Sequence, residues 1–585
     1  MRRFLTLLSL VSLVSACSSM AVAPAPASPP AVAHPHSGQS VDEAFETARR
    51  DPNALRALLL DMPKGGDLHH HLTGAVYPEV LIQLASYGGL SVDMANMAFV
   101  RCGDTPAGDA AAPIAAMTAD CKNCTDAGVC KSPLTQCAAK SGSFLPACCL
   151  CSDGGLYDGV VNALSMRGQV WGTLAAHDHF FAIFGKLGPS TQDTPSILAQ
   201  LRQQASRENL LYIETMTSIA RPQAELIAFL AQFSGGSSSP GAAFCQRLMA
   251  GPLDPAAVGE DGKAVLAAAD ALGRQAALVM AGQIDASSRL LGCEAHPEAP
   301  GCEVTVRRQI EMHRIFAPIA ICQEALAGFA ASHADRRHLV GINIVAAEDA
   351  YIARADYLRH MSLIGNLGRL YPDVGRSLHA GELAEGLVPP NDLRFHIASA
   401  VCTAGAQRIG HGVDLTYEAG SGALLQEMAG RERSPACTAH SASGAVAVEI
   451  NLVSNAQLLG VQGAEHPFPL YVAAGVPVVL ATDDPGILRT SLTEQYRRAG
   501  LDYPRLRYAD LRTFNRNSLE YSFLTGTSIW EDAGAYRRPV PSCRSPRGEG
   551  LDLGRCAEWA KTQGDKARLQ VELERRLTAF EARFH

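Results

Sequence analysis

Short apolar segments recur along the chain, and many of them end in polar residues. Compact runs rich in Val, Ile and Leu predict buried strands, whereas apolar positions spaced three and four residues apart predict helices. The strand-like segments are 68–72, 209–214, 338–344, 376–379, 407–412, 446–451 and 476–485. The helical segments are 171–184, 222–233, 262–284 and 303–335. Strands and helices are therefore predicted to alternate over most of the chain after residue 207.

Polar residues stand repeatedly at the carboxyl ends of these strands. His379 ends one strand, His411 lies between two glycines at the end of another, and Asp483 and Asp484 end a third. A parallel β/α barrel assembles its active site at the carboxyl ends of its strands, whereas a doubly wound sheet gathers its chemistry at one switch point. The predicted fold is therefore α/β, a (β/α)8 TIM-type barrel with helical extensions, in one domain over residues 41–585.

The first 40 residues predict export. A short basic start and an apolar run over residues 4–14, too short to remain as a membrane anchor, predict a signal peptide over residues 1–17. The tetrapeptide that ends at Cys17 resembles a bacterial lipobox, with an ordinary signal and an incidental cysteine as the alternative. Residues 18–40 are rich in Ala, Pro and Ser and predict a disordered tether. We expect a lipoprotein held by a lipid on Cys17, in the periplasm or at the outer membrane or cell surface.

Cysteines are frequent, with 17 in the chain, and removing Cys17 leaves an even number. Eight of them lie in an insertion expected after the first strand, over about residues 100–158. A metal cluster is one interpretation, because Cys121 and Cys124 form a C-x-x-C motif. Disulfides are favoured, because exported thiols oxidise and a small excursion without its own core needs cross-links. The eight are Cys102, Cys121, Cys124, Cys130, Cys137, Cys148, Cys149 and Cys151; the others, which can also pair, are Cys245, Cys293, Cys302, Cys322, Cys402, Cys437, Cys543 and Cys556.

The charge pattern excludes one class of partner. The formal net charge is −8, with both signs mixed and no basic tract, so nucleic-acid binding is not expected. No internal repeat is seen, and the oligomeric state is left open, with a dimer among the options.

The segment 171–184 is aromatic as well as helical in pattern, which fits either a helix over the mouth of a pocket or plain core packing. It contains a His-x-His pair, His177 and His179. Residues two apart on a helix do not face each other, so this pair is not expected to share a metal.

A first His-x-His pair, His69 and His71, lies on a predicted strand. Residues two apart on a strand point to the same face, so both imidazoles can bind one ion. Taken alone, the pair also fits a polar strand end. With His379 and Asp483 at later strand ends, three imidazoles and one carboxylate suit one divalent metal ion, with one position left for water. Glu382, three residues after His379, is then placed to transfer protons, as is the strand-end histidine between two glycines.

The order H-x-H, H-A-G-E, G-H-G and T-D-D-P resembles the adenosine deaminase family of metal-dependent amidohydrolases, from Met62 to about Leu524. The segment 62–66, Met-Pro-Lys-Gly-Gly, is most similar to the secreted adenosine deaminase growth-factor branch. The same holds for 341–345 and for 517–522, and that branch also has an insertion after its first strand.

The resemblance implies one Zn2+ per chain and a small-molecule purine nucleoside as the substrate, with adenosine, and by extension 2′-deoxyadenosine, deaminated hydrolytically to inosine and ammonia. It implies that Glu382 protonates the purine N1. It implies that His411 orients and deprotonates the attacking water, and that Asp484 accepts a hydrogen bond from the purine or places the water. The zinc ligands that it implies are His69, His71, His379 and Asp483.

Two substrate-contacting positions depart from the family pattern. The family has Asp, which binds the ribose 5′-hydroxyl, where this chain has Thr73. The glycine whose N–H meets the purine is replaced by Ala346. Should another acidic residue take over the sugar, Asp67 and Glu348 are the first candidates. The alternatives are a deaminase of another aminopurine or of a 5′-modified adenine nucleoside, and a catalytically inactive barrel that acts as a binding protein.

Overall fold

The computed structural model describes most of the chain after residue 39. The described residues are 40–102, 124, 130, 131, 134–137, 140–432, 437, 444–546, 548 and 550–584. The predicted signal peptide and tether, Cys17 and Cys121 lie outside them.

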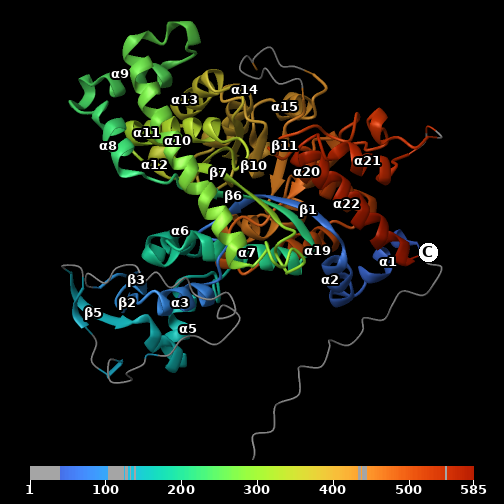
Figure 1. Cartoon of the computed structure of the whole chain (residues 1–585), viewed down its shortest axis with the longest axis horizontal. Helices are drawn as coiled ribbons and strands as arrows, with labels where there is room; N and C mark the ends of the chain where they lie inside the picture. The colour runs from blue at the N-terminus through green and yellow to red at the C-terminus, as the bar shows by residue number, and fades with distance from the viewer. Residues whose placement is uncertain are drawn as a thin grey trace, which may run out of the picture.

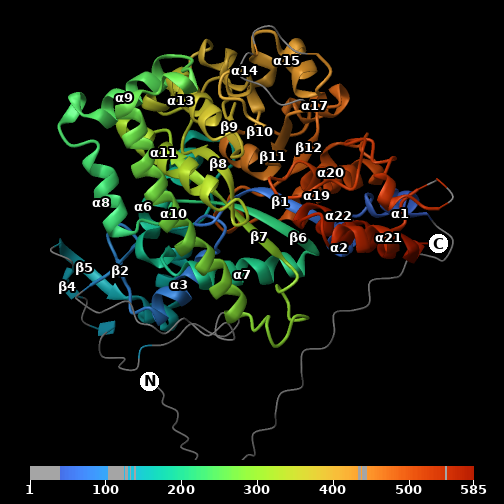
Figure 2. The ribbon, with the colours of Figure 1, turned by 45° about the horizontal axis from the view of Figure 1, so that its top comes forward.

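Eight parallel strands form the centre of the molecule (Figures 1 and 2). In sheet order they are β1 (Lys64–His71), β6 (Leu210–Thr217), β7 (Thr305–His313), β8 (Leu339–Val345), β9 (Gly375–Ala380), β10 (Arg408–His411), β11 (Ala447–Ile450) and β12 (Val478–Leu480). The sheet closes because His71 N–H donates to the Asp483 carbonyl at 2.9 Å and Asp483 N–H donates to the His69 carbonyl at 2.8 Å. The predicted barrel is confirmed.

Helices cover the outside of the barrel between successive strands. They include α7 (Thr194–Arg207), α10 (Gly259–Leu290), α11 (Pro318–Ala334), α13 (Tyr357–Leu370), α14 (His396–Cys402), α15 (Ser421–Met428), α17 (Phe468–Ala474) and α19 (Leu492–Asp502). The excursion between β6 and β7 adds α8 (Gln223–Ala231) and α9 (Pro240–Ala250). Among the described helices, α10 is long and apolar enough to cross a membrane, but it packs against α7, α8, α9 and α11 as a barrel helix (Figure 1).

The prediction of one helix over 303–335 is wrong, because β7 occupies its first part and α11 only the rest. Polar side chains on both faces of β7 explain the error. Arg308 points outward and donates to Gln283 of α10, whereas Gln309 points inward and donates to the Leu68 carbonyl of β1. The strand therefore lacks the apolar run of a buried parallel strand.

The insertion after β1 folds into its own small layer beside the barrel, at the lower left of Figure 1. It contains α3 (Pro78–Tyr87), α5 (Gly154–Ala163) and an antiparallel sheet in the order β3 (Ala98–Val100), β2 (Ser91–Asp93), β5 (Lys140–Pro146) and β4 (Leu134–Cys137). Its described disulfides are Cys102–Cys137, Cys124–Cys148 and Cys130–Cys149. The sulfurs of Cys124, Cys130 and Cys149 lie close enough to share an ion, but all three are in disulfides, so cross-linking is confirmed for these residues.

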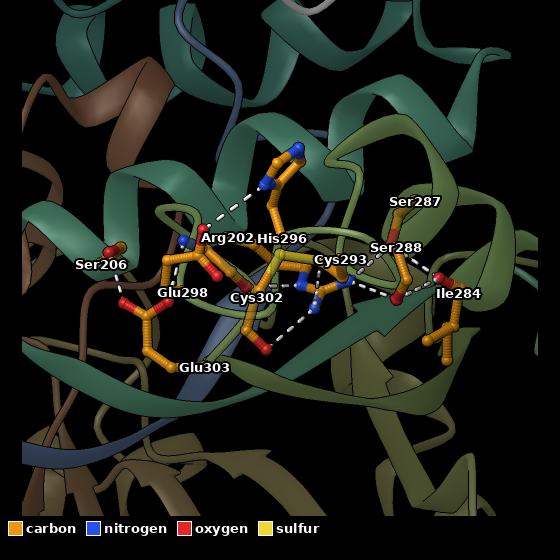
Figure 3. The surroundings of a disulfide bond; sticks show 11 residues. Arg202, Ser206, Ile284, Ser287, Ser288, Cys293, His296, Glu298, Cys302 and Glu303 are labelled. Carbon is orange, nitrogen blue, oxygen red and sulfur yellow. Dashed lines mark hydrogen bonds and ion pairs between the residues drawn. A yellow bond between two sulfur atoms is a disulfide. The ribbon is translucent and has the colours of Figure 1, made fainter.

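The other cysteines pair across helices and loops. The pairs are Cys245–Cys322, Cys293–Cys302, Cys402–Cys437 and Cys543–Cys556. Figure 3 shows the Cys293–Cys302 disulfide in the loop before β7, where the Arg202 guanidinium donates to the Gly301 carbonyl and to the hydroxyls of Ser287 and Ser288. The disulfide and Arg202 together fix how the chain enters β7.

The amino end of the barrel is closed by the C-terminal helices α20 (Tyr508–Glu520) and α22 (Asp565–Glu581). Gly66 N–H donates to the Ser518 hydroxyl at 2.6 Å. The ring of Phe523 lies so close to Gly341 and Gly375 that a β-carbon at either residue would come within 2.9 Å of it. The opposite, carboxyl end is where the polar strand ends predicted from the sequence meet.

Candidate metal centre and active site

The strand-end histidines and Asp483 meet at the carboxyl end of the barrel. His71 Nε2 lies 3.3 Å from Asp483 Oδ1 and 3.1 Å from His379 Nε2. His69 Nε2 lies 3.6 Å from the same Asp483 oxygen. We call His69, His71, His379 and Asp483 the metal site. The structure thus brings together all four ligands predicted from the sequence.

The donor set fits a divalent cation. His69 Nε2 is fully buried and has no hydrogen-bond partner among the described residues. Two imidazole nitrogens facing each other at 3.1 Å need a shared proton or a shared cation between them. The donor atoms of His69, His379, His411 and Asp483 also lie within 4.8 Å of one another, so His411 adjoins the metal site.

Local backbone conformations aim these residues. The pairing of β1 with β6 shifts in register between Asp67 and His70, so the alternation of side chains at the end of β1 is out of step with that at its start. His411 and Asp483 both have φ near +66°, a left-handed conformation that is uncommon for residues other than glycine. Such backbone strain persists where the surrounding structure holds it, often at functional sites.

A buried set of side chains orients the ligands from below. Glu449 Oε2 accepts a hydrogen bond from His69 Nδ1 at 2.9 Å, and Asn343 Oδ1 does the same for His379 Nδ1 at 2.8 Å. With Nδ1 occupied in each ring, Nε2 is left to bind a metal. Ser377 and Arg408 donate in turn to Glu449. The sequence signal for these residues was a polar side chain inside an apolar strand, which gives no hint of its partner.

Glu382 follows β9 in a loop whose start is held by the buried Glu348. The Glu348 carboxylate accepts the N–H groups of Gly381 at 3.1 Å and Glu382 at 2.9 Å, and it pairs with Arg314 and His396. Burial raises the pKa of Glu382 well above its usual value of 4.5, and the carboxylates of Asp483 and Glu348 raise it further. Glu382 is therefore protonated where an exposed glutamate would be ionised.

His411 lies beside Glu382, with 3.6 Å between its Nδ1 and Glu382 Oε1. Burial lowers the pKa of His411 to about 3, so the ring is neutral. The Asn455 side-chain amide lies 3.0 Å from the same Nδ1 and fixes the ring. A neutral imidazole has one ring nitrogen whose lone pair can accept a proton.

Asp484 is also buried, and its Oδ1 has no hydrogen-bond partner among the described residues. It presses against Gly74, where a β-carbon would come within 1.5 Å of that oxygen. Burial raises the pKa of Asp484 well above 3.8, and the neighbouring Asp483 adds to the effect.

The two substrate positions that depart from the family pattern lie at this same end. Thr73 is half-buried just after β1, and Ala346 follows β8 with φ of +74°. Glycine is favoured in that conformation. Ala346 therefore keeps the backbone conformation that a glycine would adopt there, at some cost in strain.

Helix α6 (Leu174–Leu187) crosses the mouth of the barrel. His177 Nε2 lies 3.4 Å from Asp349 Oδ1 after β8, while Gly172 N–H donates to the Gln457 carbonyl after β11. His179 turns away and contacts the Ser165 carbonyl. The helix thus covers part of the carboxyl end of the barrel, and its two histidines diverge as expected.

Part of the chain, residues 287–528, matches the family model described as adenosine deaminase. The adenosine deaminase of Enterococcus faecalis is 31% identical over 150 residues, which cover 26% of this chain and 37% of that protein. The adenosine deaminase of Shewanella loihica is 26% identical over 215 residues, covering 37% and 54%. The adenine deaminase of Sinorhizobium fredii is 30% identical over 217 residues, covering 36% and 57%. The chain thus matches between about a third and somewhat over half of the length of these relatives.

Solved structures are similar at lower identity. The adenine deaminase of Arthrobacter aurescens has a TM-score of 0.39 and 14% identity, covering 79% of this chain and 94% of that one. The Arabidopsis N6-mAMP deaminase has a TM-score of 0.43 and 15% identity, covering 80% and 95%.

Proposed function

Because the chain belongs to the adenosine deaminase family of amidohydrolases, we propose that it deaminates adenosine, and 2′-deoxyadenosine, by hydrolysis at C6. The observation that carries this proposal is the convergence of the metal site with Glu382 and His411 in one cluster of side chains at the carboxyl end of the barrel. A catalytically inactive binding protein would have no need to keep a buried acid and a buried neutral imidazole 3.6 Å apart. The growth-factor branch remains a prediction of the sequence.

We propose that the metal site holds one zinc ion. Three imidazoles and one carboxylate are a ligand set that suits zinc. In His69 and His379 the Nδ1 nitrogen is held by a buried acceptor, which leaves Nε2 to bind the ion. Zinc in such a site lowers the pKa of a water molecule towards ~7, which supplies a nucleophile near neutral pH.

The residues around the metal site divide the proton transfers. Glu382, protonated by its burial, donates to the purine N1 and so makes C6 electrophilic. His411 accepts the proton of the attacking water. The ring nitrogens of adenine, other than the one bonded to the sugar, accept hydrogen bonds. In a hydrogen bond between the ring and Asp484, the Asp484 carboxyl must therefore carry the proton and donate it. The raised pKa of Asp484 supports donation to the ring, the reverse of the direction expected from the sequence. Loss of the amino group as ammonia then leaves inosine.

The test is ammonia release from adenosine, from 2′-deoxyadenosine and from free adenine, before and after a chelator. We expect release from both nucleosides, loss with the chelator and recovery with zinc. Adenine is included because one relative is an adenine deaminase. Release from adenine alone would reassign the substrate, and release from none of the three would support the inactive barrel.

We also propose that the protein is an exported lipoprotein anchored through Cys17. Seven disulfides in the described residues support an oxidising compartment. Mass spectrometry of the membrane-bound protein should find an acylated N-terminal Cys17, and Cys17→Ala should abolish the modification. An unmodified N-terminus elsewhere would contradict the proposal.

A further inference from the structure

The hydroxyl groups of a nucleoside's sugar can donate hydrogen bonds to a carboxylate. Thr73, which stands where the family has such a carboxylate, offers only a neutral hydroxyl. This inference rests on the proposed nucleoside substrate. Sites that bond a hydroxyl through a buried polar group discriminate strongly against analogues that lack the hydroxyl. The question is which acidic residue of this chain faces the pocket with spare capacity to accept.

The two candidates suggested by the sequence, Asp67 and Glu348, are both excluded by the structure. Asp67 accepts from the N–H and the hydroxyl of Thr482, and it borders a small cavity that faces α7 and α19 outside the barrel. The Glu348 carboxylate already accepts hydrogen bonds from the N–H groups of Gly381 and Glu382. It also forms ion pairs with Arg314 and His396. Neither carboxylate can turn to a substrate.

Glu311 on β7 is placed differently. Side chains alternate along a strand, and Gln309 on the same strand points inward to Glu214 and to β1. Glu311 therefore points inward as well, one step nearer the carboxyl end. It stands in register with Asn343, whose side chain holds His379.

The Glu311 carboxylate also has capacity to spare. Its side chain is 11% exposed, and it accepts one bond from the Ser218 hydroxyl at the end of β6. Its ion-pair partner among the described residues is His313, whose Nε2 lies 3.8 Å away while its Nδ1 bonds to Glu324. A carboxylate offers about four acceptor sites, so most of those on Glu311 are free for a ligand.

We propose that Glu311 is a specificity-determining residue that accepts a hydrogen bond from a ribose hydroxyl of the nucleoside. The acceptor has moved from the end of β1, at Thr73, to the end of β7, two strands along the sheet. The Glu311 carboxylate would also repel a phosphate group on the sugar. Nucleotides are therefore expected to be poor substrates.

The experiment compares wild type with Glu311→Gln on adenosine and on its 5′-, 3′- and 2′-deoxy analogues. A hydrogen bond to a charged group corresponds to a loss of about 10- to 100-fold in kcat/KM on adenosine. On the analogue that lacks the contacted hydroxyl, the two enzymes should agree within about threefold. Metal content and the unfolding midpoint should be unchanged.

Glu303→Gln is the matched control. Glu303 lies just before the opposite end of β7 and bonds to the Ser206 hydroxyl (Figure 3). We expect no change in substrate preference from it. A loss in Glu311→Gln that is equal on all four substrates, or no loss, would overturn the role of Glu311 while the wild type still deaminates adenosine. Wild type inactive on every nucleoside would instead overturn the proposed function and this inference with it.

Discussion

Replacing Arg408 by methionine removes a buried cation that links two carboxylates, Glu214 and Glu449, under the metal site. Arg408 is fully buried and donates to Glu449 and to Glu214. It also donates to the Tyr521 carbonyl at 2.9 Å, and its guanidinium carbon lies 3.8 Å from the centre of the Phe523 ring. Methionine fills similar volume but takes the guanidinium partner away from both carboxylates.

The magnitude follows from that stranded charge. Removing one partner of a buried ion pair costs about 3–5 kcal/mol, much more than the pair contributes net. We therefore expect Arg408→Met to lower the free energy of unfolding by about 3–5 kcal/mol. Because Glu449 also orients His69, zinc affinity should fall by about 10- to 100-fold, the usual cost of disturbing a ligand's supporting residue. Urea unfolding with the disulfides intact gives the first quantity, and competition with a chelator gives the second.

Two further variants sharpen the test. Arg538→Met removes an arginine that is 69% exposed and paired with Asp532, so it should change stability by less than about 0.5 kcal/mol. Adding Glu214→Gln to Arg408→Met removes one stranded charge and should recover part of the loss. A cost below about 1 kcal/mol for Arg408→Met, or no recovery in the double variant, would refute the account of this buried network.

Three other predictions concern Glu382, His71 and Asp414. Glu382→Gln should lower kcat by about 10²–10⁴-fold with zinc retained, and a rate within a few-fold of wild type would place the acid elsewhere. His71→Ala should lose both the metal, about one ion per chain, and the activity; elemental analysis that finds activity without metal would contradict this. Burial raises the pKa of Asp414 well above 3.8, and both its oxygens lack hydrogen-bond partners among the described residues. Its folded state keeps a proton that the unfolded chain releases, so stability is lost as pH rises above 3.8, and Asp414→Asn should escape this loss. If the melting temperatures of wild type and Asp414→Asn change with pH by the same amount, Asp414 is not the source of the pH dependence.

The residues that end apolar strands were predictable, because a polar side chain after a buried run is a local signal. His379, His411 and Asp483 all came from that signal, and the structure brings them together. Their supports were not predictable. Glu449 lies 380 residues from His69 in the chain, and only the closed barrel brings their side chains within 2.9 Å. Disulfides were predictable as a class, because the cysteines are many and crowded in the sequence. Their pairing was not, because it depends on which cysteines the folded chain brings together.

The strand that the sequence concealed, β7, is explained by its two faces. Its outward face alternates Arg308 with Ile310 and Met312, and Ile310 packs against α11 so closely that a β-carbon at Gly328 would lie 3.1 Å from it. Its inward face is polar, which hides the strand from an apolar pattern. A one-residue slip would turn Ile310 and Met312 into the polar interior and bury Gln309 and Glu311 against a helix. The apolar outer face therefore fixes the register that turns Gln309 toward Glu214 and β1 and sets Glu311 near the carboxyl end of the barrel.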